Sequence, residues 1–335
     1  MTKIQFTHSY QDIIEIENLL EAWKEFLCGK KKKVDVQIFE RNLMSNVISL
    51  HNDLKEKTYK HSAYEAFNIS DPKPRVIHKA KVRDRLLHHA IYCYLYPFFD
   101  KTFIADSYSC RLGKGTHKAI VRFHDFNLKI SKNNTKQVWV LKCDIRKFFD
   151  SINHEILLKI LNEYIQDKDL INLLQGIISS FYKKEAGVGL PLGNLTSQLF
   201  VNIYMNVFDQ FVKHKLKAKY YIRYSDDFVI LSADKKWLED ILPKISNFLG
   251  EKLKLSLHPN KVSINTFSSG VDFLGWVNFS DHKVLRTTTK RKMFRNILAQ
   301  GFKEEVVQSY LGLISHGNTR KIKDKVLSLI KQNVL

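Results

Sequence analysis

The sequence predicts an α+β fold, in which a mostly antiparallel sheet is backed by helices and flanked by two basic lobes. Helical and strand-like runs alternate along the 335 residues, and residues 220–231 alternate like two strands around a tight polar tip. Residues 283–335 combine helical periodicity with twelve Lys and Arg against three Asp and Glu. A hydrophobic content of 44% is enough for a buried core.

The N-terminal third is predicted to be largely helical. Residues 11–27 repeat apolar side chains at helical spacing and end at Gly29. The four lysines that follow, residues 30–33, fit a solvated turn as well as a loop that contacts phosphates. A short extended piece at 72–77 then precedes a predicted helix over 83–99.

The central part supplies the predicted sheet. A strand is expected over 137–145, then a helix that opens near residues 151–153. The glycine-rich link 186–194 leads into a long amphipathic helix from Thr196. Helix, strand and hairpin patterns continue to residue 279, before the basic helical end.

Charge and cysteine usage restrict the possible partners. Fifty-four Lys and Arg against 34 Asp and Glu give a net charge of +20, which favours a polyanionic partner, most commonly nucleic acid. The four cysteines are scattered, which argues against a disulfide framework or a zinc knuckle. Because no stretch approaches the ~20 apolar residues of a membrane span and the N-terminus is polar, we expect a cytoplasmic protein without membrane partners.

Three carboxylates stand where metal-dependent chemistry would need them. Asp144 ends an apolar strand, and Asp226 and Asp227 form the tip of the 220–231 hairpin. Nucleotidyl transfer uses two divalent ions about 3.5–4 Å apart, held by rigidly placed oxygen ligands. Two adjacent acids beside an apolar core repel each other unless a cation neutralises them. A polar hairpin turn would be the plain alternative for these residues alone.

Seven segments argue against a mere polar turn, because together, and in the same order along the chain, they resemble motifs of the reverse transcriptase family. DIRKFFD at 144–150 and LPLGNLTSQ at 190–198 resemble the family's first and second palm motifs, and YSDD at 224–227 resembles its Y-x-D-D box. The segment around Lys261 is similar to the fourth palm motif, and FLGW at 273–276 is similar to the primer grip. KPR at 73–75 and YSCRLGKGTH at 108–117 resemble finger motifs of the group II intron and bacterial branch.

The resemblance implies a right-hand polymerase with an antiparallel palm sheet. We expect fingers over 1–137, a palm over 138–281 and a basic helical thumb over 282–335. The implied activity is RNA-directed DNA polymerisation, with template RNA, a nucleic-acid primer and dNTPs as partners. Two Mg²⁺ ions, for which Mn²⁺ can substitute, are the implied cofactors.

The same resemblance assigns roles to the site residues. Asp144 and Asp226 bridge both ions, Ile145 lends a backbone carbonyl, and Asp227 supports them. Lys261 is either a solvated lysine or the proton donor to the pyrophosphate leaving group.

Five further residues are expected to bind the nucleotide. Arg75 is either a surface cation or the clamp on the triphosphate, and Lys73 assists it in the second case. Phe149 is either a core aromatic or the steric gate against a 2′-hydroxyl. Leu192 and Gln198 stand where most reverse transcriptases have the glutamine of P-Q-G and the proline of S-P.

These two departures, within the string LGNLTSQ, are similar to enzymes of diversity-generating retroelements, which miscopy template adenines. The expected partners then include a noncoding RNA and a small accessory protein or partner subunit. Two alternatives remain open: a phage-defence reverse transcriptase that makes DNA of fixed or repetitive sequence, and a non-catalytic RNA-binding scaffold that kept the fold.

Overall fold

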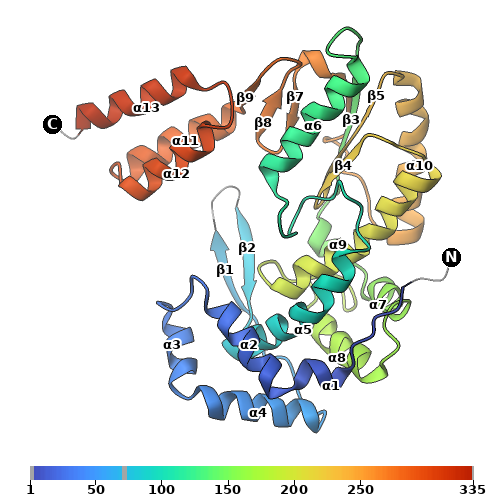
Figure 1. Cartoon of the computed structure of the whole chain (residues 1–335), viewed down its shortest axis with the longest axis vertical. Coiled ribbons are helices and arrows are strands. Elements are labelled where there is room, and N and C mark those ends of the chain that lie inside the picture. Colours follow the sequence, from blue (N-terminus) through green and yellow to red (C-terminus); the bar gives the residue numbers. More distant parts are fainter. Residues whose placement is uncertain (1–3, 70–73, 334–335) are drawn as a thin grey trace.

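The computed structural model describes residues 4–69 and 74–333, so Lys73 lies outside the described residues. Helices and antiparallel sheets are mixed, which confirms the predicted α+β class. In Figure 1 the N-terminal helices form the lower part of the molecule, the main sheet lies above them, and the last three helices form an arm at the upper left.

The N-terminal part is helical, as predicted, but the helix expected over 11–27 is divided in two at Glu15. Ser9 and Asp12 form a capping box that begins the first piece. The Asn18 side chain donates to the carbonyl of Ile13 at 2.6 Å and so satisfies an acceptor at the break. The helices are α1 (Tyr10–Ile14), α2 (Ile16–Leu27), α3 (Val34–Arg41) and α4 (Leu43–Lys55).

A two-stranded antiparallel hairpin follows, and its second strand lies against the glycine-rich link. The amide of His78 donates to the carbonyl of Leu192 at 3.0 Å, and Asn194 Nδ2 donates to the carbonyl of His78 at 2.9 Å. Gly193 has a φ of 105°, and a Cβ there would lie 2.6 Å from Ile77 Cγ2, so only glycine fits this close approach. The elements are β1 (Glu65–Ile69), β2 (Arg75–Lys79), α5 (Val82–Asp100) and α6 (Thr116–Ser131).

The main sheet has the strand order β4-β5-β3-β6, and every neighbouring pair is antiparallel. Both faces are covered. Val140 and Val229 pack toward α6, whereas Leu141 and Ile230 pack toward α9 and α10. The elements are β3 (Trp139–Asp144), β4 (Tyr221–Tyr224), β5 (Asp227–Ser232), β6 (Ser263–Thr266), α9 (Leu195–Gln210) and α10 (Lys235–Leu253). The strands predicted over 137–145 and 220–231 are therefore confirmed.

Between β3 and α9 the chain forms a 3-10 turn and two helices. Asn153 begins the predicted helix, because its Oδ1 accepts from the amide of Ile156 at 2.9 Å. The apolar stripe of α9 packs into the largest core, and a π-helical turn extends that helix. The elements are η1 (Phe148–Ser151), α7 (His154–Asn162), α8 (Lys168–Ser179) and η2 (Phe211–Lys215).

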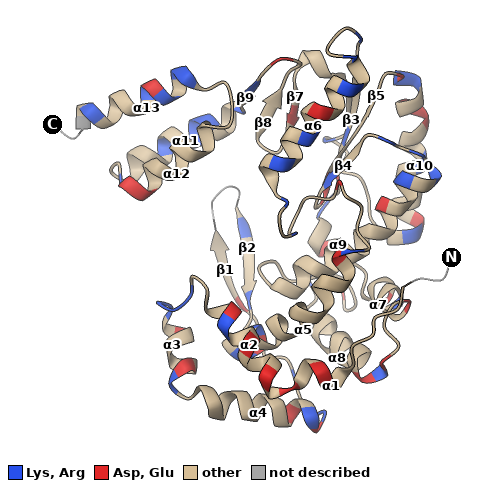
Figure 2. Ribbon diagram, in the orientation of Figure 1, with Lys and Arg blue, Asp and Glu red and all other residues tan. Residues whose placement is uncertain are grey.

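The C-terminal part is a three-stranded antiparallel sheet followed by three helices. Trp276 is 1% exposed and packs with Leu285, Met293 and Ile297 in a core of its own. In Figure 2 several Lys and Arg positions are blue along α11 and α13 of this arm. The elements are β7 (Val271–Phe273), β8 (Trp276–Asn278), β9 (Lys283–Leu285), α11 (Thr287–Ala299), α12 (Glu304–Ile314) and α13 (Arg320–Asn333). Among the described residues, none of the helices combines the length and apolarity needed to cross a membrane.

Candidate active site

The register of the main sheet brings the three predicted carboxylates together where β3 ends and β5 begins. Asp144, the last residue of β3, pairs with Asp227, the first residue of β5. Asp226 lies in the turn between β4 and β5, and its carbonyl accepts a hydrogen bond from the amide of Ile145 at 3.1 Å. Residues 82 positions apart in the sequence, 144 and 226, are thus held together by main-chain hydrogen bonds.

Lys261 contacts one of these carboxylates directly. Its Nζ lies 2.9 Å and 3.0 Å from the two carboxylate oxygens of Asp144. The loop is fixed beside it, because the amide of His258 donates to the carbonyl of Asp144 and the amide of Lys261 donates to the carbonyl of His258. The ammonium therefore neutralises Asp144, while proton donation by Lys261 to a leaving group stays a prediction.

The two acids of the hairpin are held in a setting that disfavours their charge. Burial raises the pKa of Asp226, Asp144 raises it further, and Lys261 and Arg75 oppose the shift. Burial also raises the pKa of Asp227 to about 7; Lys142 opposes this shift, while repulsion from Asp144 and Asp226 adds to it. One buried oxygen of Asp227, Oδ1, has no hydrogen-bond partner among the described residues. The folded site therefore disfavours the ionised form of both acids.

A divalent cation fits this chemistry. All three side chains offer carboxylate oxygens, the donors that magnesium prefers. Within residues 4–69 and 74–333, no three His, Cys, Asp or Glu side chains converge into a ready-made ligand cluster, and Asp144 is turned onto Lys261. A divalent ion would relieve the penalty that raises both pKa values. The assignment of Asp144, Ile145, Asp226 and Asp227 as ligands stays a prediction.

We expect Asp227→Asn to stabilise the protein above pH 7 when divalent ions are absent. The folded state raises the pKa of Asp227 to about 7, so it binds this proton more tightly than the unfolded chain does. Wild-type stability is then lost as the pH rises from the unfolded pKa, about 4, to about 7. The asparagine cannot ionise, and its gain should be on the order of 2 kcal/mol at pH 8. Thermal unfolding of both proteins at pH 8 and pH 4.5 measures it. Equal unfolding temperatures at pH 8 would contradict the prediction.

Arg75 and Leu192 line one cavity of about 230 Å³, and their contact with a nucleotide stays a prediction. His78 lies in its wall, and burial lowers the pKa of this imidazole, so that it is neutral at pH 7. Its Nδ1 is buried without a partner among the described residues. The complete lining is Arg75, Val76, His78, Asp150, Lys183, Leu190 and Leu192.

Phe149 lies beside this cavity rather than in its lining. Its carbonyl accepts from the amide of Leu190 at 2.8 Å, and its ring meets that of Phe148 edge to face, with centroids 5.6 Å apart. The neighbouring Asp150 lines the cavity instead. The structure thus shows Phe149 packed against the core, and its role as a steric gate stays a prediction.

Gln198 lies at a different cavity from Leu192. That cavity measures about 330 Å³ and has a cationic side, to which Lys30, Lys79 and Arg85 contribute. Strand β2 separates the two, because His78 lines the smaller cavity while Ile77 and Lys79 line the larger one. Leu192 and Gln198, the two departures from the common motif, therefore lie on opposite sides of strand β2.

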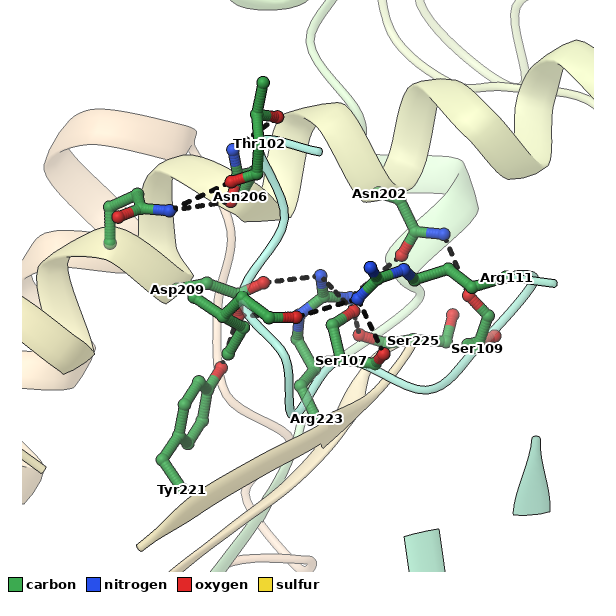
Figure 3. Close-up of polar contacts among 12 residues, drawn as sticks. Thr102, Ser107, Ser109, Arg111, Asn202, Asn206, Asp209, Tyr221, Arg223 and Ser225 are labelled. Atoms are coloured by element: carbon green, nitrogen blue, oxygen red, sulfur yellow. Dashed lines mark hydrogen bonds and ion pairs between the residues drawn. The ribbon is translucent and has the colours of Figure 1, made fainter. Parts of the chain in front are cut away.

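Several polar residues at the site were not singled out from the sequence. His78, Asp150 and Lys183 line the smaller cavity, together with Arg75 and Leu192. Arg223 and Asp209 form an ion pair whose two side chains have no exposed surface (Figure 3). The available signal was an arginine inside the otherwise buried strand YYIRY, a position that normally requires a buried partner.

A family model described as "Reverse transcriptase (RNA-dependent DNA polymerase)" matches residues 60–277. The sequence is 26% identical over 259 residues to Protein YkfC of Escherichia coli, covering 66% of each chain. It is 23% identical over 276 residues to the group II intron-encoded protein LtrA of Lactococcus lactis, covering 62% of this chain and 44% of LtrA. The chain spans between 20% and 66% of the length of the first curated relatives it matches.

Solved structures also match. One is the apo telomerase from Candida tropicalis truncated from its C-terminal domain, with a TM-score of 0.47 and 14% sequence identity. The match covers 73% of this chain and 59% of that one.

Proposed function

Because the chain belongs to the reverse transcriptase family, with group II intron-encoded homologues at low identity, we propose that it is an RNA-directed DNA polymerase. It extends the 3′-hydroxyl of a primer with dNTPs on template RNA and releases pyrophosphate. One observation carries the proposal. The register of β3 against β5 brings Asp144 to Asp226 and Asp227 at the edge of the sheet, beside the cavity that holds Arg75.

The carboxylates of Asp144 and Asp226, supported by Asp227 and the carbonyl of Ile145, would hold two Mg²⁺ ions, for which Mn²⁺ can substitute. Bound metal would lower the pKa of the primer 3′-hydroxyl and neutralise the triphosphate. Arg75, helped by Lys73, positions the triphosphate, and Phe149 limits the space beside C2′ of the sugar. Lys261, which holds Asp144 through both carboxylate oxygens, supplies the proton for the leaving group.

The three parts of a right hand follow from this assignment. We assign residues 1–137 to the fingers, 138–281 to the palm and 282–335 to a basic thumb. Helices α11 and α13 carry most of the thumb's lysines and arginines, which suit contacts with the phosphates of a template–primer duplex. The net charge of +20 supports the same partner.

Primer extension tests the proposal. The purified chain is incubated with a defined RNA template, an annealed DNA primer, dNTPs and Mg²⁺, and the products are resolved by length. Template-dependent extension that EDTA stops is the expected result. Binding of the duplex without any extension, in Mg²⁺ and in Mn²⁺, would favour a non-catalytic scaffold instead.

We further propose that the enzyme is error-prone at template adenines, as part of a diversity-generating retroelement with its noncoding RNA and accessory protein. The string LGNLTSQ supports this subfamily. Leu192 supports the proposal of lowered fidelity, because it lines the cavity beside Arg75 and its side chain has no hydrogen-bonding group. A phage-defence enzyme is the alternative that the next experiment distinguishes.

Leu192→Gln is expected to lower misincorporation opposite template adenine more than opposite the other three bases. A glutamine amide can hydrogen-bond a correctly placed nucleotide, whereas leucine cannot. One such bond contributes about 0.5–1.5 kcal/mol, or roughly threefold to tenfold in discrimination. Sequencing cDNA copied by both proteins at matched yield measures the change, and the other three bases are the internal control. Identical error spectra would remove Leu192 as a fidelity determinant, and a wild-type spectrum without adenine bias would favour defence.

A further inference from the structure

A fully buried ion pair lies next to the turn that carries Asp226 (Figure 3). Arg223 donates through Nε to one carboxylate oxygen of Asp209 at 2.8 Å and through Nη2 to the other at 2.7 Å. The hydroxyl of Tyr221 also donates to Asp209, at 2.7 Å. Burying such a pair costs about as much as the pairing returns, and apolar residues of similar size are often equally stable. Stability alone therefore does not explain an arginine here.

The rest of the guanidinium group contacts the turn itself. Nη1 of Arg223 donates to the carbonyl of Ser225 at 3.1 Å. Ser225 is the first of two turn residues and has a φ of 59°, a conformation for which this turn favours glycine. A serine there costs roughly 1–2 kcal/mol, so the turn is held by contacts outside it. The carbonyl of Ser225 is held by Arg223, and the carbonyl of the next residue, Asp226, is held by the amide of Ile145.

Arg223 is itself fixed from several sides. Its amide donates to the carbonyl of Asp106 at 3.0 Å, and its carbonyl accepts from the amide of Tyr108 at 2.9 Å. Nη2 donates to the hydroxyl of Ser107 at 3.2 Å, and Nη1 to the side-chain oxygen of Asn202 at 3.3 Å. Arg223, through its backbone and its side chain, thereby joins β4 to helix α9 and to the segment 106–109. Arg223 cannot shift without moving all three.

We propose that Arg223, oriented by Asp209, is a positioning residue that sets the Ser225–Asp226 turn and so presents the Asp226 carboxylate to the reaction. The proposal rests on the proposed polymerase function, since it gives the turn a catalytic purpose. Arg223 acts through the turn, because a side chain with no exposed surface reaches neither primer nor nucleotide.

The test replaces Arg223, Asp209 and Tyr221 together rather than one partner of the ion pair. Removing a single charge would leave the other buried and unpaired, at a cost of about 3–5 kcal/mol. The triple variant Tyr221→Phe/Asp209→Leu/Arg223→Met keeps similar volumes without polar atoms, so we expect it to fold with an unfolding temperature close to that of the wild type. The variant loses the hydrogen bond from Arg223 Nη1 to the carbonyl of Ser225. We expect kcat for primer extension to fall roughly 10²-fold, with unchanged affinity for the template–primer duplex.

Hydrogen exchange provides a readout that does not depend on activity. The amide of Ile145 bonds to the carbonyl of Asp226, so its protection reports the conformation of the turn. We expect this amide to exchange at least about tenfold faster in the triple variant. The amide of Phe267, bonded to the carbonyl of Val138 elsewhere in the fold, is the internal reference and should not change.

Two further variants complete the experiment. Arg223→Lys keeps the charge beside Asp209, but its compact ammonium cannot also reach Ser225, so we expect the same loss of kcat and of Ile145 protection. Arg122→Lys is the matched control. Arg122 pairs with Asp106 in the adjoining segment at 2.9 Å, and because lysine keeps a positive charge beside Asp106, kcat and Ile145 exchange should stay unchanged.

The outcomes distinguish the positioning role of Arg223 from the polymerase function. Normal kcat and normal Ile145 exchange in the triple variant and in Arg223→Lys would overturn the positioning role and leave the polymerase function intact. A wild-type protein that never extends a primer would overturn the polymerase function, whatever the exchange shows. Faster Ile145 exchange together with a lower kcat at unchanged duplex affinity supports both.

Discussion

Asp226→Asn is expected to lower the rate of primer extension by at least about 10³-fold, which corresponds to roughly 4 kcal/mol of transition-state stabilisation. The asparagine keeps the size of the side chain and leaves the carbonyl of Asp226 bonded to Ile145. It removes one of the carboxylate charges that would hold the metal ions. The affinity for RNA should stay within about twofold, because it depends on phosphate contacts elsewhere.

The measurement compares single-nucleotide extension rates and filter binding to the same duplex at one salt concentration. Asp240→Asn is the matched control, since Asp240 is an exposed residue of α10, the helix that packs against β3 and β5. The control should extend primers like the wild type. Polymerisation by Asp226→Asn within tenfold of the wild type would rule out Asp226 as an essential metal ligand.

Arg75→Ala has the next largest expected effect, a rise of about 10- to 100-fold in the KM for dNTPs, as expected for the loss of a charge-assisted hydrogen bond. Arg75 lies in the wall of the smaller cavity and is close enough to Asp226 to lower that residue's pKa against the larger effect of burial. A triphosphate reaching the carboxylates would therefore pass its guanidinium group. Because the contact is present before and during reaction, kcat should change little.

Steady-state incorporation of one dNTP on a fixed template–primer duplex measures KM and kcat separately. Arg75→Lys keeps the charge without the bidentate fork and should fall between the wild type and the alanine variant. Arg41→Ala, an exposed arginine of α3, is the control and should not alter KM. If Arg75→Ala instead weakened duplex binding at an unchanged KM, its role would be contact with nucleic-acid phosphates.

Local periodicity predicted the elements that carry the site. The segment 137–145 is a short apolar run that ends in an acid, and 220–231 is two largely apolar runs around a polar tip. Both are strands in the structure, with the acids at their ends. The break at Glu15 was missed because it depends on a side chain, Asn18, that bonds the carbonyl of Ile13. Such a contact has no periodic signature, since the apolar spacing continues unchanged through residues 11–27.

The sequence by itself determined the α+β class, the order of the motifs and the residue types at the site, because these depend on patterns within a few residues. The tertiary structure decided which residues meet. It paired Asp144 with Asp227, put Leu192 and Gln198 at different cavities, and buried Arg223 against Asp209. These outcomes depend on strand register and on contacts between residues far apart in the chain. A shift of one residue in a strand would turn every side chain to the other face, and local sequence patterns do not specify which strand lies alongside.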